Sequence, residues 1–144
     1  MPKLFLSLLL LPLFIAACTP ATEDTGPSLS IDMDRVTVSG ISAGAHMAHQ
    51  LHIAYSDLFT GAGIVSGGPY NCADNSLNQG LSQCMMNLDQ PIDTAVIAEG
   101  IRAAAAAGEL ADPANLADDH VFTFRGTNDS KISALVHNSA ATVY

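Results

Sequence analysis

The sequence predicts an α/β fold built on a parallel sheet of about three strands, in the order β-α-β-α-β-α. Short patterns typical of strands alternate with longer helical patterns from residue 34 onward, and each strand pattern ends close to a glycine. This alternation is typical of parallel sheets with right-handed crossovers. The chain has 144 residues, of which 49% are apolar, so it can bury one modest core.

The first half of this pattern gives a strand, a helix and a second strand. Residues 35–39 alternate between β-branched and polar types and lead into Gly40, which predicts a strand. Residues 43–57 carry apolar side chains at helical spacing, and residues 62–66 form a short apolar run typical of a buried strand. The expected apolar stripe of the helix consists of Met47, Ala48, Leu51, Ala54, Tyr55 and Leu58.

The second half repeats the pattern after a long loop. Residues 67–91 are rich in turn-forming types and are expected to form a loop that holds two cysteines. Residues 92–108 are helix formers that stop at a glycine, and residues 120–124 alternate like a strand. Residues 131–144 show weak helical spacing, which predicts a last helix.

The N-terminus has the composition of an export signal. Residues 1–17 hold 13 apolar residues and one charge, and their apolar run is too short to span a bilayer. The stretch ends in Ile-Ala-Ala-Cys, which resembles a bacterial lipoprotein box and implies lipidation of Cys18 and anchoring in the envelope membrane. An ordinary secretory signal with a free Cys18 is the alternative. Residues 18–33 then form a flexible tether, and residues 34–144 form the domain.

The charge balance excludes nucleic acid as the main partner. The chain has 5 Lys and Arg against 14 Asp and Glu, for a net charge of −9, and its few cations are scattered. Nothing in such a chain could neutralise a run of phosphates.

The cysteines agree with export. If Cys18 carries lipid, Cys72 and Cys84 remain as a pair that an oxidising compartment would allow to bond. The bond would close a loop of about 13 residues, worth about 3 kcal/mol in the chain-entropy model. Two unpaired thiols or a metal site are the alternatives. Neither cysteine has a further Cys or His at ligand spacing, which disfavours the metal.

The motif Gly40-Ile-Ser42-Ala43-Gly44 suggests a nucleophilic serine. It follows a strand and opens a helix, as a nucleophile elbow requires, and small neighbours let the two elements approach closely. The helix N-terminus favours developing negative charge, and the N–H of Ala43 would be one oxyanion donor. The alternative is a glycine-rich turn in which Ser42 caps the helix.

Asp129 is the candidate acid. It follows the third strand, and the carboxyl ends of parallel strands lie on one edge, so it should emerge on the same side of the sheet as Ser42. An acid there could orient a histidine and stabilise its charged form. The alternative is a turn aspartate that accepts hydrogen bonds from its own backbone.

None of the five histidines is a suitable general base. His46, His49 and His52 lie on the helix that leads away from Ser42, and they form a poor metal set, so we expect them to be packed or surface residues. His120 precedes a strand and so lies at the wrong edge of the sheet. His137 follows Asp129 by only eight residues.

Five segments of the chain share motifs with a known family. They are residues 38–52, 61–65, 67–72, 112–122 and 126–129. Together they closely resemble secreted poly(3-hydroxybutyrate) depolymerases and related esterases, over about residues 34–135.

The resemblance implies a circularly permuted α/β-hydrolase fold. It implies hydrolysis of poly(3-hydroxybutyrate)-like polyesters or short hydroxyacyl esters through an acyl-enzyme, with neither a metal nor an organic cofactor. By position Ser42 matches the nucleophile and Asp129 the acid, while Cys72 and Cys84 match a loop disulfide.

The chain departs from the family in one respect. The family's catalytic histidine follows the acid by a few tens of residues, in a segment that this sequence does not reach. We therefore expect either part of a longer reading frame or a degenerate remnant, with an incomplete fold and weak or absent catalysis. Alternatives are a non-catalytic envelope lipoprotein that retains the scaffold, or peptidase or thioesterase chemistry on the same scaffold.

Overall fold

The computed structural model describes residue 26, residues 29–86 and residues 89–144. The predicted signal of residues 1–17 and the lipidation of Cys18 lie outside the described residues, as does most of the predicted tether. Residues Ile31–Tyr144 form one compact unit. Within the described ranges, no helix combines the length and apolarity needed to cross a membrane.

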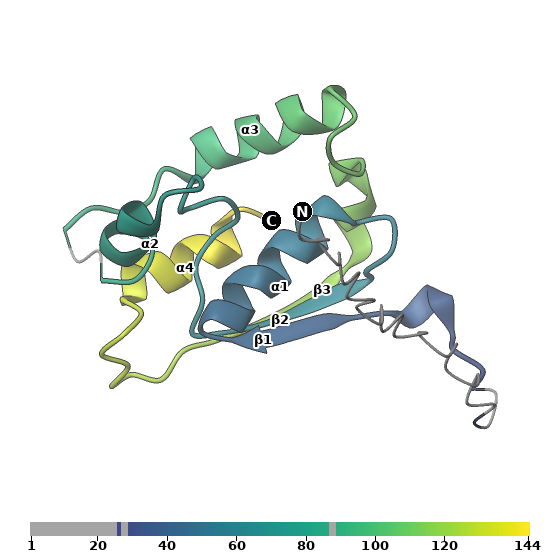
Figure 1. The fold of residues 1–144 in the computed structure, drawn as a ribbon, viewed down its shortest axis with the longest axis horizontal. Helices are drawn as coiled ribbons and strands as arrows, with labels where there is room; N and C mark the ends of the chain where they lie inside the picture. The colour runs from purple at the N-terminus through teal and green to yellow at the C-terminus, as the bar shows by residue number, and fades with distance from the viewer. Residues whose placement is uncertain (1–25, 27–28, 87–88) are drawn as a thin grey trace, which may run out of the picture. The chain divides into compact units, whose positions relative to one another are not determined.

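The predicted parallel sheet is present. It consists of β1 (Val38–Ile41), β2 (Gly61–Val65) and β3 (His120–Phe124), in the order β1-β2-β3 with both pairs parallel. The register aligns Ile41 with Val65 and Val65 with Phe124, so the carboxyl ends of all three strands share one edge (Figure 1). The α/β fold class predicted from the alternating pattern is confirmed.

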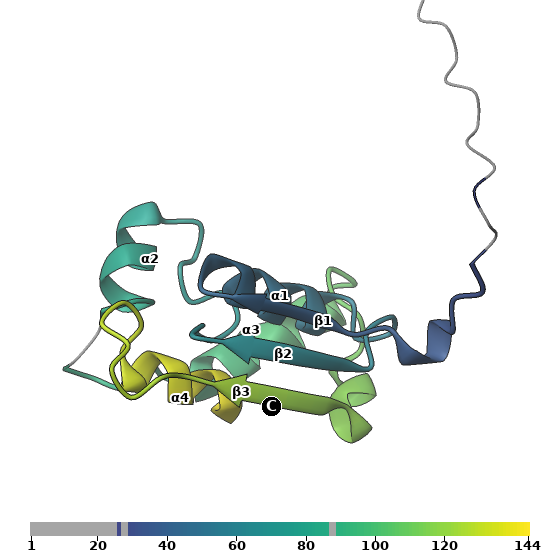
Figure 2. The same cartoon turned by 90° about the horizontal axis from the view of Figure 1, so that it is seen from below.

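Helices cover one face of this sheet. In both views α1 (Ala43–Ala54), α3 (Thr94–Ala106) and α4 (Ala134–Thr142) lie on the same side of the strands (Figures 1 and 2). The core sits between α1, α4 and the strands, where apolar side chains exclude water. Its members are Ala45, Ala62, Ile64 and Ala140, with Val38 and Val121 packed against them.

Two short helices were not predicted. The expected loop of residues 67–91 contains α2 (Leu77–Gln83), which begins where the Ser76 hydroxyl accepts a hydrogen bond from the Gln79 amide. A 3-10 helix, η2 (Pro113–Asp118), precedes β3 and is capped by the carboxylate of Asp112. Both begin with a side-chain cap, which satisfies amide groups that a helix start leaves unpaired.

The first strand lies later in the sequence than predicted. Residues 35–39 were expected to form it, but β1 spans Val38–Ile41, and Arg35 belongs to the 3-10 turn η1 (Met33–Arg35). The Asp32 carboxylate caps this turn by accepting from the amide of Asp34. At residues 33–35 this capped turn forms in place of the strand that the β-branched alternation predicted.

The predicted apolar stripe of α1 is only partly correct, since Ala48 is buried but other members are not. Met47 and Tyr55 are more than half exposed, and the helix ends at Ala54 rather than at residue 57. The buried side of α1 instead carries two histidines, His49 and His52, among small and aliphatic residues. Hydrogen bonds to the imidazoles make this burial possible, and hydrophobic spacing alone gives no sign of them.

Candidate active site

Ser42 lies at a sharp turn between β1 and α1. Its backbone has φ 56° and ψ −119°, a conformation that residues other than glycine rarely adopt. The turn is held on both sides, because the Ser42 amide donates to the carbonyl of Val65 at 2.9 Å and its carbonyl accepts from the amide of His46 at 3.1 Å. The surrounding structure therefore holds an exposed serine in a strained backbone, as the elbow motif predicts.

The two glycines of the motif have different roles. A Cβ at Gly40 would overlap the backbone of Gly44, so only glycine lets the strand and the helix approach this closely. A Cβ at Gly44 would meet nothing within 4 Å. The steric demand of the elbow therefore falls on Gly40 alone.

The start of α1 leaves donors available near Ser42. The Ser42 hydroxyl makes no capping hydrogen bond to the helix, so the interpretation of this residue as a simple capping serine fails. Ala43 is the first residue of α1, where amide groups have no partner within the helix. These amides and the helix dipole provide a positive environment beside the hydroxyl.

A cavity of about 460 Å³ opens beside Ser42. Ser42, Ala43 and Met47 form its wall on the α1 side, and α2 with the loop before it forms the other wall. Most side chains that line it are apolar, including Leu77, Leu81, Met85 and Ile132. A small apolar acyl group fits such a surface better than a charged one.

Asp129 lies in the loop that follows β3. One oxygen of its carboxylate accepts hydrogen bonds from the amides of Lys131 at 2.8 Å and Ile132 at 3.1 Å. These two backbone hydrogen bonds, followed by one from the Ser66 side chain, lower the pKa of Asp129 below its ordinary value. The carboxylate is therefore charged, but its bonds to the amides are those of the turn aspartate that the sequence left as an alternative.

Two residues that support Asp129 were missed in the sequence. Arg125 follows β3 directly and donates to the carbonyls of Ile132 at 2.6 Å and Asp129 at 2.8 Å, which closes the loop on itself. Ser66 directly follows β2 and has a left-handed backbone with φ 50°. Both directly follow a strand at the carboxyl edge of the sheet, and that position could have identified them.

His49 of α1 and His137 of α4 bond to backbone carbonyls rather than to Asp129. His49 donates from Nδ1 to the carbonyl of Gly68 at 3.1 Å, and His137 donates from Nδ1 to the carbonyl of Gly67 at 3.2 Å. They fix the segment after β2 that leads into the cavity wall. His46 lines the cavity with Ser42, and its Nε2 is buried without a hydrogen-bond partner among the described residues.

No histidine of the described ranges is a hydrogen-bond partner of Asp129. Within the same ranges, no three His, Cys, Asp or Glu side chains are arranged to hold a metal ion. Asp129 thus lies after β3, at the carboxyl edge of the sheet, and its role as the acid of a catalytic site stays a prediction.

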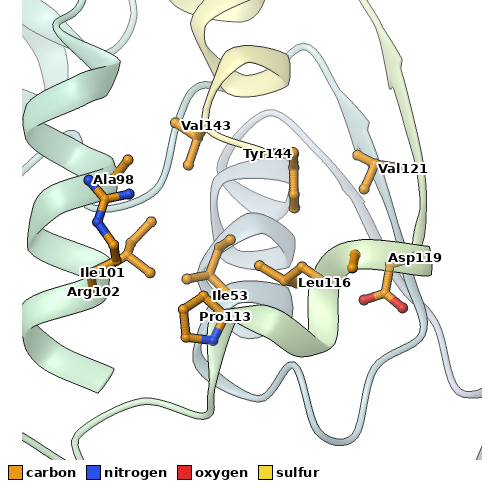
Figure 3. Close-up of a pocket in the computed structure, with 11 residues that line it drawn as sticks. Ile53, Ala98, Ile101, Arg102, Pro113, Leu116, Asp119, Val121, Val143 and Tyr144 are labelled. Carbon is orange, nitrogen blue, oxygen red and sulfur yellow. The ribbon is translucent and has the colours of Figure 1, made fainter. Parts of the chain in front are cut away.

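A second cavity, of about 510 Å³, lies near the other end of α1 (Figure 3). Asp119 and Tyr144 line it, and both bond to the buried His52, with 3.0 Å from Nε2 to the Asp119 carboxylate and 2.8 Å from Nδ1 to the phenol oxygen. Because a carboxylate only accepts, Nε2 donates, and a neutral ring then accepts from the phenol. Burial, followed by the nearby charge of Asp119, raises the pKa of Tyr144, so the phenol keeps its proton and can donate it to the ring.

The predicted disulfide is present. Cys72 and Cys84 are bonded across 12 positions, with their Cα atoms 5.8 Å apart. Both cysteines line the cavity beside Ser42, so the bond fixes the wall that carries α2. The two alternatives left open by the sequence, free thiols and a metal site, are thereby excluded for this pair.

Comparison with characterised proteins identifies several relatives, although no family model matches the chain. A poly(3-hydroxybutyrate) depolymerase of Delftia acidovorans is 40% identical over 119 residues, which cover 82% of this chain and 24% of that protein. A polyhydroxybutyrate depolymerase of Talaromyces funiculosus is 35% identical over 113 residues, covering 78% of this chain and 32% of the relative. The chain thus spans about a quarter to a third of the length of these relatives.

Solved structures agree with the sequence comparison. A PHB depolymerase variant complexed with an R3HB trimer matches 81% of this chain with a TM-score of 0.69 and 29% identity. The PHB depolymerase of Penicillium funiculosum matches 78% with a TM-score of 0.67 and 30% identity. These matches cover 35% and 34% of the neighbours' own chains. The resemblance drawn from the motifs is confirmed, and the chain is a homologue of the PHB depolymerases over most of its own length.

Proposed function

We propose that this chain carries the nucleophile half of a serine esterase site that acts on poly(3-hydroxybutyrate)-like polyesters or short hydroxyacyl esters. The observation that carries the proposal is the strained, exposed Ser42 between β1 and α1, beside a mostly apolar cavity. The relatives are named as depolymerases of the same polymer, and one neighbour is complexed with an R3HB trimer.

In the proposed reaction, the Ser42 hydroxyl attacks the ester carbonyl and the alcohol part of the substrate leaves. The amide of Ala43 stabilises the oxyanion of the tetrahedral intermediate, and water then hydrolyses the acyl-enzyme. Asp129 takes the place of the acid that orients a histidine base. The described residues supply no histidine to Asp129, so we expect weak or absent turnover from this chain alone.

An assay with p-nitrophenyl butyrate tests the serine's role. The chain and its Ser42→Ala variant are compared at equal concentration, and we expect the variant to lose at least about tenfold of any hydrolysis above the buffer rate. Ser82→Ala is the matched control, since Ser82 is an exposed serine whose hydroxyl donates only to the nearby carbonyl of Asn78. Equal hydrolysis by the chain and by Ser42→Ala would remove the enzymatic proposal for this chain.

The alternative is a non-catalytic envelope lipoprotein that keeps the scaffold. The backbone-bonded carboxylate of Asp129 favours it, because that carboxylate has no histidine to orient among the described residues. A mass spectrum of the exported protein tests the lipid-anchored location that both proposals share. An unmodified Cys18, or a mature N-terminus at another residue, would contradict the anchor.

A further inference from the structure

Helix α2 presents its apolar side to the cavity beside Ser42. The residues of this side are spaced three or four positions apart and all line the cavity, namely Leu77, Gly80 and Leu81, with Cys84 at the C-terminal cap. No residue of α2 is buried, and Leu77 and Leu81 are 79% and 54% exposed. The apolar side of the helix therefore faces open space instead of a core, which leaves it available to an apolar ligand.

Gly80 leaves a gap in the middle of this wall. It lies inside the helix, where glycine is a poorer helix former than alanine. A Cβ at this position would meet the Ala73 side chain at 3.4 Å, which is ordinary van der Waals contact. Packing therefore does not require glycine here, in contrast to Gly40, where a Cβ would overlap the backbone of Gly44. What a larger residue at position 80 would remove is space in the cavity.

The opposite wall carries the groups of the proposed reaction. Ser42 and Ala43, the nucleophile and the oxyanion donor of that proposal, line the same cavity as Gly80. An ester bound at Ser42 places part of its chain in this cavity. Each unit of a 3-hydroxyacyl ester carries an alkyl side group, which is a methyl group in 3-hydroxybutyrate. The gap at Gly80 is the part of the α2 wall where such a group meets no side chain.

We propose that Gly80 determines the size of the alkyl side group that the cavity accepts, and that the gap admits 3-hydroxyacyl units with side groups longer than methyl. This inference rests on the proposed function, since it takes the cavity to be the place where the ester binds. A methylene group that fits or fails to fit an apolar pocket changes affinity by about 10- to 200-fold. A side chain at residue 80 therefore excludes a longer alkyl group while a methyl group still enters.

A binding experiment with uncleaved ligands tests the role of Gly80. All chains carry Ser42→Ala, so that the serine cleaves neither probe, and calorimetry measures the Kd of each probe. The probes are the trimers of (R)-3-hydroxybutyrate and (R)-3-hydroxyhexanoate, which differ in having methyl or propyl side groups. We expect Gly80→Leu to weaken binding of the hydroxyhexanoate trimer at least about tenfold more than binding of the hydroxybutyrate trimer.

The matched control is Gly100→Leu. Gly100 lies inside α3, is exposed, and would have no atom within 4 Å of an added Cβ. It is not among the described residues that line the cavity beside Ser42. This variant makes the same exchange within a helix, and it should bind both trimers as the Ser42→Ala chain does. If Gly80→Leu fails to fold, as judged by circular dichroism, Gly80→Ala carries the same test with a smaller loss.

The outcomes separate this inference from the proposed function. An unchanged ratio of the two Kd values in the residue-80 variants would overturn the role of Gly80, as would a Ser42→Ala chain that binds neither trimer. Discrimination as expected, together with equal hydrolysis of p-nitrophenyl butyrate by the chain and by Ser42→Ala, would leave that role in place and overturn the enzymatic proposal. Hydrolysis that depends on Ser42, with affinities that do not respond to residue 80, would do the reverse.

Discussion

Helix α1 begins at an exposed serine with a left-handed backbone, whereas its last turns are anchored by buried histidines with hydrogen-bonded rings. At the first end the Ser42 hydroxyl has no capping partner, and at the second end His52 bonds through both ring nitrogens. Backbone strain lies where the chemistry is proposed, whereas the last turns are held by hydrogen bonds of His49 and His52, with only the Nε2 of His49 left without a partner among the described residues. The two ends of α1 are therefore held by different means, the bend at Ser42 by backbone hydrogen bonds and the last turns by histidine side chains.

The largest expected effect comes from the steric requirement at the strained end. Gly40→Ala places a Cβ against the backbone of Gly44, and neither strand nor helix can shift without loss of packing. We expect the free energy of unfolding in urea to fall by about 4 kcal/mol, the upper end for a single substitution. A variant with the same urea midpoint as the unaltered chain would contradict the close approach.

The buried His49 near the C-terminal end of α1 should make the free energy of unfolding depend on pH. Burial lowers the pKa of His49 from 6.5 to about 4, opposed by its hydrogen bond to Gly68. The unfolded chain therefore binds a proton that the folded chain excludes. This stability is fully present above pH 6.5 and is lost as the pH falls towards 4, by up to about 3 kcal/mol.

Urea denaturation between pH 7 and pH 4 measures this slope. His49→Gln should flatten it, since an amide can still donate to Gly68 but does not titrate. His120→Gln is the matched control, because His120 is exposed. The same slope in His49→Gln as in the unaltered chain would show that other groups, such as His46 and His52, dominate the acid response.

The smallest effect is expected at the second glycine of the elbow. Gly44→Ala meets no atom within 4 Å and replaces a poor helix former by the best one. We expect a gain of up to about 1 kcal/mol in the free energy of unfolding, from the same urea measurement. A loss comparable to that of Gly40→Ala would show that both glycines are sterically required.

The sequence was most informative where local pattern decides the structure. β3 spans residues 120–124 as predicted, and the turn at Ser42 lies between a strand and a helix as predicted. Both depend on residues that are neighbours in the sequence, namely the alternation of a strand and the small residues of a tight turn. The buried side of α1 could not be predicted, since it depends on His49 reaching Gly68 and His52 reaching Tyr144. These contacts join residues 19 and 92 positions apart, beyond any helical spacing.

For the candidate site, the sequence predicted the positions of the residues but not their hydrogen bonds. Topology placed Ser42 and Asp129 at one edge of the sheet, and the parallel register agrees with that edge. The hydrogen bonds of Asp129 to the Lys131 and Ile132 amides depend on the path of a short loop, which composition does not determine. Two helices with isolated caps, α2 and η2, were missed for a similar reason.

The bond between Cys72 and Cys84 ties the shape of the cavity beside Ser42 to the redox state of the surroundings. Because α2 has no buried residue of its own, its position depends on the disulfide and on a few hydrogen bonds, such as that from the Gln79 side chain to the Cys72 carbonyl. A chain kept in a reducing compartment would therefore carry Ser42 beside a loosened wall, and oxidation of the two thiols would fix that wall. Any assay of this protein in dithiothreitol would measure the elbow without its binding surface.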